Sequence, residues 1–398
     1  MKIDLGSAPS GPLTGIRVLD LSAVISGPLA AQILGDLGAE VIKVESPNGD
    51  SARRLGPPFR DGGQTPLFSN VNRNKRSIVL DLKKPRAREA ARALAARADV
   101  VIENFRPDVA ERIGVGYADL ARDNPGLVYV SINGFGPDGP YRDLHAYDLV
   151  IQALSGVAER QRDGDRPALV HSIVADKIAA MTAAQAVLAA LVERGRSGRG
   201  QHVEVPMLDA FAAFLLPDLL AERTFVGETQ GLPFDLDNLY RCWPTRDGHV
   251  AMVVLEDDQF EGLLAALDRR DLLDDERANS LIARVLNADA LFEILGQEIL
   301  KWTTADLVAR AREFGAPLAP VYDIDAFLAD PHVEATGIVA KYRTAEGEET
   351  RTVSHPARYA RTPASMRARP PALGEHTADV LAELGWNADA IERVNDEE

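Results

Sequence analysis

Short apolar runs alternate with amphipathic stretches along the first third of the chain. Each run has the length of a strand, and helix-like stretches begin after two of them, at Pro28 and Pro85. Proline suits the first position of a helix, because that position needs no backbone N–H donor. Buried strands separated by helices are typical of a parallel, doubly wound sheet. We therefore predict an α/β fold with a Rossmann-like large domain, whose first strands lie at 16–22, 41–45, 77–82, 100–104 and 127–132.

The pattern then changes and divides the chain into domains. Residues 146–222 are mainly helical in pattern, apart from a short strand at 202–205, and a glycine-rich turn at 195–200 stops the helix before it. Periodicity is weak after residue 222; a strand at 250–254 and several amphipathic helices follow, one opening at Thr303. We predict a large domain at 1–222, a linker at 223–238, a smaller α+β domain at 239–330, and a C-terminal segment at 331–398 that returns to the large domain and carries a last helix near 377–384.

Composition and charge narrow the class of protein. The 398 residues are 46% hydrophobic and 26% charged, which is the balance of a soluble globular protein and excludes a disordered or collagen-like chain. There are 44 Lys and Arg against 60 Asp and Glu, so the net charge is −16. A field of this sign argues against binding to nucleic acid or to an anionic membrane surface.

The remaining composition bears on compartment and metals. Cys242 is the single cysteine, so no intrachain disulfide can form, and the first residues lack the apolar core of a signal peptide. The longest mostly apolar run, at 178–192, is too short to span a bilayer. The seven histidines form no cluster with metal-ligand spacing, so we expect no metal site. We predict a reduced, cytoplasmic protein.

One glycine motif is a decoy. The segment GFGPDG at 134–139 matches G-x-G-x-x-G and follows a strand. However, Pro137 and Pro140 break the helix start that would hold a pyrophosphate, and the motif follows the fourth strand-like run rather than the first. We interpret it as a tight turn, so nothing indicates a dinucleotide-dependent oxidoreductase.

Asp176 is the candidate nucleophile. It follows an apolar run and precedes a long apolar helix, so we expect it half buried at a helix N-terminus, where partial positive charge favours an anion. A carboxylate held dry beside backbone N–H groups could attack an activated acyl group. The alternative is an Asp that only caps the helix, and the pattern alone favours that alternative.

Two further segments carry polar side chains. The basic clusters at 72–76 and 83–86 flank one predicted strand and could hold a polyphosphate such as coenzyme A or a nucleotide, or could form a solvated edge. The pattern favours neither. The segment from His145 to Asp148 precedes a helix; it could reach into the sheet crevice, although the pattern favours a helix start with Tyr147 packed on the core.

Taken together, a series of short motifs resembles the class III CoA-transferase (CaiB/BaiF) family over nearly the whole chain. Each motif is weak alone, but their order and spacing are specific. They are LTGIRVLDLS (13–22), GP (27–28), LGAEVIKVE (37–45), NKRS (74–77), VIENF (101–105), YD (147–148), QALSG (152–156), GRGQ (198–201) and LGEHT (373–377).

The resemblance implies an activity and assigns roles. It implies an acyl-CoA:carboxylate CoA-transferase in which Asp176 forms an aspartyl anhydride and then an aspartyl-CoA thioester, with no permanently bound cofactor and with CoA as substrate. It places the pantetheine of CoA near Val24 and Ile25, the adenosine near Leu80 and Lys83, and the rest of CoA along a groove. The other implied contacts are Asn104, Phe105, Arg112, Ile113, His145 and Tyr147.

The resemblance also implies a dimer of two chains threaded through each other as interlocked rings. Its formyl-CoA transferases have a glutamine where this chain has Ile25 and a glycine-rich loop in the second domain that this chain lacks, so an oxalate/formate pair is not expected. They also have a lysine near the phosphates where this chain has His145. Short dicarboxylates such as succinate are expected instead. Residues of the partner's small domain would help to shape the acyl pocket, among them Asn238, Tyr240 and Asp257.

Other functions remain open at this point. The same fold is found in α-methylacyl-CoA racemases, which place a histidine where this chain has Tyr147. A phenol with a pKa of about 10 is a poor base at neutral pH, so the racemase ranks second. A non-catalytic acyl-CoA-binding protein, or an oxidoreductase on a doubly wound sheet, ranks third. The presence of Asp176 and the missing dinucleotide fingerprint count against both, and fold alone would not decide among these functions.

Overall fold

A computed structural model describes residues 3, 5–58, 64–227, 240–344 and 347–396. The chain forms two compact units: Met1–Ala221 with Thr336–Glu398, here called the large unit, and Glu222–Ala335, here called the small unit. Residues 228–238 of the predicted linker, which include Asn238, lie outside the described residues.

The large unit is built on a six-stranded sheet in the order β3-β2-β1-β4-β5-β6, and every neighbouring pair is parallel. This is the Rossmann-like order, in which the direction of winding reverses between β1 and β4. The predicted parallel, doubly wound sheet is confirmed. Its strands are β1 (Arg17–Asp20), β2 (Glu40–Glu45), β3 (Lys75–Val79), β4 (Val100–Glu103), β5 (Val128–Asn133) and β6 (Gln201–Pro206).

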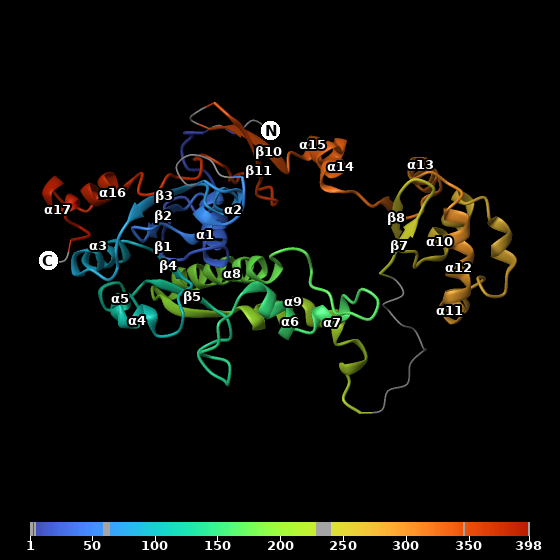
Figure 1. Cartoon of the computed structure of the whole chain (residues 1–398), viewed down its shortest axis with the longest axis horizontal. Helices are drawn as coiled ribbons and strands as arrows, with labels where there is room; N and C mark the ends of the chain where they lie inside the picture. Colours follow the sequence, from blue (N-terminus) through green and yellow to red (C-terminus); the bar gives the residue numbers. More distant parts are fainter. Residues whose placement is uncertain (1–2, 4, 59–63, 228–239, 345–346, 397–398) are drawn as a thin grey trace. The chain divides into compact units, whose positions relative to one another are not determined.

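Helices cover both faces of this sheet (Figure 1). Alternate residues of each strand point to opposite faces, so Ile102 lies in one core cluster and Val101 in the other. The first cluster holds α1 (Ser26–Asp36), α6 (Asp148–Leu154), α7 (Val157–Arg160), α8 (Val174–Ser197) and α9 (Met207–Leu219). The second holds α3 (Pro85–Ala95), α4 (Val109–Arg112), α5 (Tyr117–Asp123), α16 (Thr377–Glu383) and α17 (Ala388–Glu392).

Helix α8 runs through the first core cluster. Its seven buried residues are six alanines and one valine, and small side chains allow the close contacts that α8 makes with α1 and α9. The helix ends at Ser197, and the next residue, Gly198, adopts φ +74°. We predicted that the turn at 195–200 stops the helix before residue 195, but the helix continues past Gly195 and ends within that segment. At 24 residues α8 exceeds the predicted run 178–192 and is long and apolar enough to cross a membrane by length and composition; the core helix of a soluble protein meets the same criteria.

The C-terminal segment lies beside β3. Strands β10 (Val339–Arg343) and β11 (Glu349–Val353) form an antiparallel pair, and the chain then passes Asn74, whose Oδ1 accepts from the backbone N–H groups of Arg367 (2.8 Å) and Ala368 (2.9 Å). The His376 N–H donates to the Ser77 carbonyl at 2.9 Å. Residues far apart in sequence therefore build one edge of the large unit.

The small unit has its own core, centred on Trp243, Val250 and Leu264. Its antiparallel sheet consists of β7 (Cys242–Pro244), β8 (His249–Met252) and β9 (Leu318–Pro320). Thr303 caps α13 as predicted, since its Oγ1 accepts from the Asp306 N–H at 3.1 Å. The helices are α10 (Asp257–Ala266), α11 (Leu281–Leu286), α12 (Ala288–Ile299), α13 (Thr304–Phe314), α14 (Ile324–Ala329) and α15 (Pro331–Thr336), the last of which reaches the boundary of the unit.

Candidate active site

A cavity of about 570 Å³ lies at the carboxyl ends of β1 to β4. In doubly wound sheets this is where ligands bind, at the point where the strand order reverses. The turn after β1 contributes Ser22 and Ala23, and the segments after β2, β3 and β4 supply the other walls. Five residues expected to contact CoA line this one cavity: Leu80, Lys83, Phe105, Arg112 and Ile113.

The turn between β1 and α1 is held from two sides. The Asn104 side chain accepts from the Ala23 N–H (2.9 Å) and donates to the Ala23 carbonyl (2.8 Å) and to Ser26 Oγ (3.3 Å). The Val24 N–H donates to Asp50 Oδ1 at 3.0 Å. Val24 has φ +70°, a rare conformation for a β-branched residue, with a strain of about 1–3 kcal/mol. Val24 and Ile25, the two predicted pantetheine contacts, do not line the cavity, and Ile25 is buried. Asn104 does not line it either, but its side chain fixes the turn.

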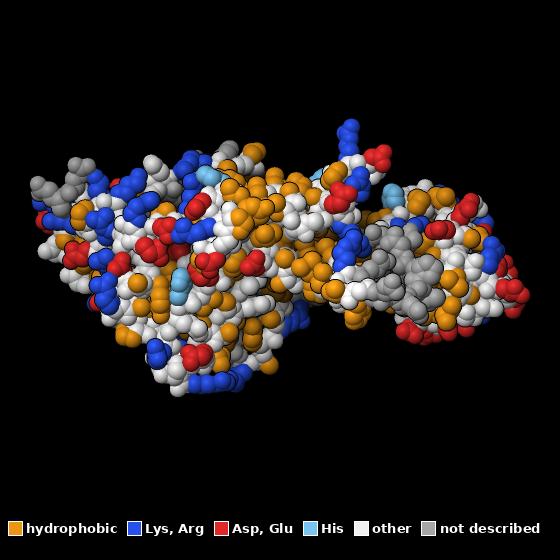
Figure 2. All heavy atoms as spheres, turned by 90° about the horizontal axis from the view of Figure 1, so that it is seen from below, with side chains coloured by type: hydrophobic (Ala, Val, Ile, Leu, Met, Phe, Trp, Pro, Cys, Tyr) orange, Lys and Arg blue, Asp and Glu red, His pale blue; other side chains and the backbone are white. Residues whose placement is uncertain are grey.

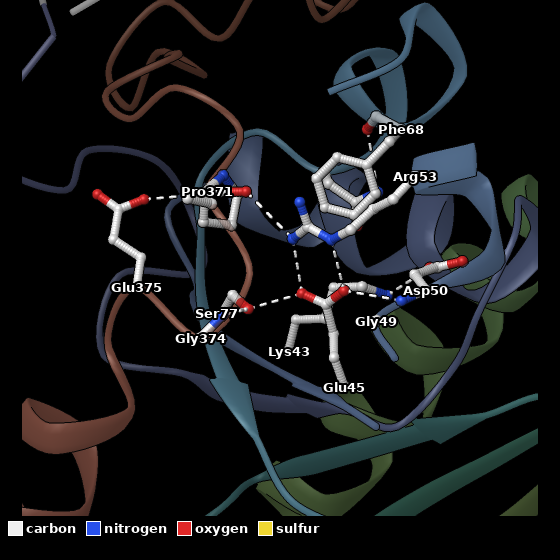
Figure 3. A network of polar contacts seen from close by, with 12 residues as sticks. Lys43, Glu45, Gly49, Asp50, Arg53, Phe68, Ser77, Pro371, Gly374 and Glu375 are labelled. Atoms are coloured by element: carbon white, nitrogen blue, oxygen red, sulfur yellow. Dashed lines mark hydrogen bonds and ion pairs between the residues drawn. The ribbon is translucent and has the colours of Figure 1, made fainter. Parts of the chain in front are cut away.

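A network of buried charges lies beneath this turn (Figure 3). Lys43 Nζ contacts Asp50 Oδ2 at 2.9 Å and donates to the Ser22 carbonyl at 2.9 Å. Arg53 holds Glu45 with two hydrogen bonds, at 2.8 and 2.7 Å, while Arg53 also covers the Phe68 ring. Burial alone would raise the pKa of the Asp50 carboxyl, but the Lys43 charge and backbone donors bring it below its ordinary value. The network therefore anchors the turn with charges that stay ionised.

The basic cluster at 72–76 is tied into the same framework of buried charges, and Asn74, Lys75 and Arg76 also line a second cavity, of about 910 Å³. Lys75 is buried and contacts Asp20 Oδ2 at 2.8 Å, and Arg73 contacts Asp36 through two nitrogens at 2.9 and 2.5 Å. The solvated edge that we considered is therefore wrong for Arg73 and Lys75, whereas the polyphosphate site stays a prediction. The acidic partners come from β1 and α1, which the local sequence around Lys75 cannot reveal. In the second cluster, Lys83 lines the first cavity.

Asp176 is the third residue of α8 and its side chain is partly buried. Burial and then the negative charge of Asp148 raise its pKa to about 6, while hydrogen bonds from the hydroxyl and backbone N–H of Ser26 act in the opposite direction. Ser26 is the first residue of α1, so Asp176 lies against the N-terminus of that helix. Through Ser26 and Asn104 it is connected to Ala23 in the cavity wall.

The helix-capping alternative for Asp176 is wrong. The N-cap position of α8 is Ile173, and the N–H groups of Ala175 (2.7 Å) and Asp176 (3.2 Å) donate to Asp148 Oδ2. Two of the α8 N–H groups that we expected beside the Asp176 carboxylate are therefore bound to Asp148 instead. Ser26 and Asp148 were missed as site residues; the signals for Asp148 in the sequence were its place in the YD motif and in the polar segment from His145 that precedes a helix.

The two other predicted contacts lie on exposed chain. His145 is exposed, with Nδ1 3.0 Å from Arg106 Nη2, and Tyr147 directly precedes α6 with its side chain 69% exposed. The expectation that Tyr147 packs on the core is therefore wrong. In the small unit, Tyr240 is exposed and Asp257 contacts Arg284 at 2.5 Å. Across the described ranges, no group of three or more His, Cys, Asp or Glu side chains is arranged to hold a metal ion.

Known proteins match this chain over nearly its whole length. The profile of CoA-transferase family III matches residues 13–377. The succinate–glutarate CoA-transferase of Agrobacterium fabrum is 38% identical, over 96% of this chain and 97% of that protein. The succinyl-CoA:mesaconate CoA-transferase of Haloarcula marismortui is 36% identical, over 94% of this chain and 97% of that protein. A crystal structure of a CaiB/BaiF family protein from Brucella suis has a TM-score of 0.82 at 34% identity, covering 94% of this chain and 100% of that chain.

The fold, the cavity and these matches define a class of protein: the chain belongs to CoA-transferase family III. It is a class III CoA-transferase, an enzyme that moves CoA between an acyl-CoA and a carboxylic acid, and the family and activity predicted from the sequence are confirmed.

Proposed function

We propose that this enzyme transfers CoA by covalent catalysis on Asp176. The observation that carries the proposal is a partly buried carboxylate with a pKa of about 6, set against the first turn of α1. Ser26 and Asn104 connect it to Ala23 in the wall of the cavity at the switch point of the sheet. A carboxylate of raised pKa is ionised at neutral pH and more basic than an ordinary aspartate, which suits a nucleophile.

The proposed reaction divides one exchange into balanced steps. An Asp176 oxygen attacks the donor thioester carbon, which releases CoA thiolate and leaves a mixed anhydride. The thiolate attacks the aspartyl carbon, which releases the donor acid and leaves an aspartyl-CoA thioester. The acceptor carboxylate then attacks this thioester, forming a second anhydride and releasing thiolate. Attack of the thiolate on the acceptor carbon gives the new acyl-CoA and restores Asp176. Each covalent step is easier than direct exchange between two poor partners.

The cavity accounts for the binding of CoA. Lys83 and Arg112 line it beside the apolar side chains of Leu80, Phe105 and Ile113. Cationic side chains hold phosphate groups, and apolar walls hold the adenine ring and the pantetheine chain. For the acids, the relatives carry the names of succinate, glutarate and mesaconate. We therefore propose short dicarboxylates as donor and acceptor, with Tyr240, Asp257 and Asn238 of a second copy shaping the acyl pocket.

The exposed apolar side chains support a homodimer, which we propose to be interlocked. Helices α6 and α9 are neighbours in the large unit, and hydrophobic side chains gather on the face seen in Figure 2. Burying this surface would favour association. Light scattering in solution should give twice the chain mass, and a monomer would contradict this part of the proposal. The exposed residues are Leu149, Val150 and Leu154 of α6, with Phe214, Leu216 and Leu220 of α9 and its end.

The experiment is to incubate the enzyme with a panel of acyl-CoA donors in D2O, quench with hydroxylamine and analyse the peptides by mass spectrometry. We expect a hydroxamate on Asp176 that requires a dicarboxylyl-CoA and is absent from Asp176→Asn. Deuterium at the acyl α-carbon without any adduct would contradict the proposal and favour the racemase chemistry.

A further inference from the structure

Asp148 is a buried carboxylate that the proposed reaction does not use. It is the first residue of α6 and is only 6% exposed. Within the described chain, no Lys, Arg or His forms an ion pair with it. Its Oδ2 instead accepts from the N–H groups of Ala175 and Asp176, at 2.7 and 3.2 Å, and its Oδ1 accepts from Gln152 Nε2 at 2.5 Å. The first turn of α8 thus balances the Asp148 charge, as helix N-termini do for anions.

Gln152 fixes Asp148 in this position. The Gln152 side chain accepts from the Val170 N–H at 2.9 Å and donates to the Ser172 carbonyl at 3.1 Å. The amide is therefore tied to the segment that leads into α8, and it presents its N–H to Asp148. Because every polar atom in this arrangement has a partner, the carboxylate has little freedom to move away from the helix start.

The consequence concerns the nucleophile one residue further along α8. Backbone donors at a helix start would stabilise the Asp176 anion and make it a weaker nucleophile. Asp148 occupies those donors and adds a like charge close by. The other charged neighbour on α8, Lys177, donates to Ser172 Oγ at 2.9 Å, and the side chains of His145, Tyr147 and His171 on the flanking segments are exposed. The contacts from α1 come from Ser26, which carries no charge.

We propose that Asp148 is a positioning residue for the transfer reaction: it takes the N-terminal donors of α8 so that the Asp176 carboxylate stays reactive. This inference rests on the proposed function of Asp176. It predicts that Asp148 acts through its charge in addition to the hydrogen bonds by which it takes these donors, whereas a merely structural side chain would act through shape and hydrogen bonds alone.

The test compares Asp148→Asn with the wild-type enzyme at a series of pH values. The rate of hydroxamate formation on Asp176 is measured in a single turnover. The Asp176 carboxyl is titrated by ¹³C NMR, and its signal is identified as the one that is missing from the spectrum of Asp176→Asn. Wild type should lose activity as pH falls through about 6, because protonated Asp176 cannot attack. In D148N the acidic limb of the pH–rate profile and the midpoint of the NMR titration should both move to lower pH by about one unit. The rate on the plateau at higher pH should also fall.

Two variants serve as controls. Asp148→Glu keeps the charge and should leave the limb close to its wild-type position. Asp143→Asn removes an exposed carboxylate from the same segment, 84% exposed and paired with Arg142, and should change nothing. If D148N does not fold, Asp148→Ser offers a neutral acceptor at the same site.

The inference would be overturned by a folded neutral variant in which the acidic limb of the pH–rate profile and the NMR titration stay at the wild-type pH and only the plateau rate is reduced. That result would leave the proposed function intact. Absence of any adduct in the wild-type enzyme would count against the proposed function instead. The NMR titration would then still decide whether Asp148 acts on Asp176.

Discussion

At the scale of single residues, Asp176 combines reactivity with a loss of stability. Its pKa in the folded chain is about 6, above the ordinary value of 3.8. A group whose pKa is raised by folding binds its proton more tightly in the native state than in the unfolded state. The stability that it contributes is therefore full below pH 3.8 and is lost as the pH rises through about 6. At neutral pH the ionised carboxylate destabilises the fold.

Replacing Asp176 by Asn should therefore stabilise the protein while abolishing transfer. We expect the free energy of unfolding to rise by on the order of 1–3 kcal/mol at pH 7.5, and by less at pH 5. Urea unfolding at the two pH values measures this difference. Equal stability of the two proteins at pH 7.5, or a larger gain at pH 5, would show that Asp176 is not held at a raised pKa.

Residue types at the site were predictable only in part. Asp176 stood out as an acid before a long apolar helix, but the pattern alone favoured a helix cap, and the family resemblance assigned its role as nucleophile. The resemblance likewise assigned Lys83 to CoA, since the pattern alone left a solvated edge equally open. Lys75 and Arg73 look equally available in the sequence, yet each is buried against an acid from another element, Asp20 and Asp36. Pairing of this kind depends on tertiary contacts, which local patterns do not contain.

At the scale of elements, the turn from β1 into α1 determines where Ser26 meets Asp176. Gly27 lies inside the first turn of α1, and a Cβ there would stand 2.2 Å from both Cβ and Oγ of Ser22. Ser22 in turn donates to Asp20 in the buried network. The missing side chain therefore lets α1 start close to the end of β1.

Gly27→Ala should move the start of α1 and pull Ser26 away from Asp176. We expect a loss of stability of about 1–3 kcal/mol and a marked loss of transfer in the protein that still folds. Gly195→Ala is the matched control, because Gly195 is inside α8 with open space around it, and alanine there should stabilise by up to about 1 kcal/mol. A G27A variant with wild-type stability and rate would show that this close approach does not hold the site.

The same elements show how far the sequence pattern predicts structure. Apolar runs located β1, β2, β4 and β5 to within a few residues. They placed β3 at 77–82, whereas it spans Lys75–Val79, because its first two residues are charged and were interpreted as part of a basic pocket. Lys75 is nevertheless a strand residue, paired with Val41 of β2 and buried. A buried ion pair makes a charged residue compatible with a sheet interior.

At the scale of the whole molecule, alternation of strands and helices was enough to predict a parallel doubly wound sheet, and hence a ligand site at its carboxyl edge. It could not show that Asp148, from a segment 28 residues before Asp176, would take the donors of α8. That feature depends on a contact between segments distant in sequence.

The central claim is that the oxygen atoms of Asp176 take part in the exchange. When thiolate attacks the acceptor carbon of the second anhydride, the bridging oxygen, which came from the acceptor acid, stays on Asp176. Turnover with an acceptor labelled with ¹⁸O in its carboxylate should therefore raise the mass of the Asp176 peptide by about 2 Da for each oxygen exchanged. Continued turnover that leaves this peptide unlabelled would contradict covalent catalysis by Asp176.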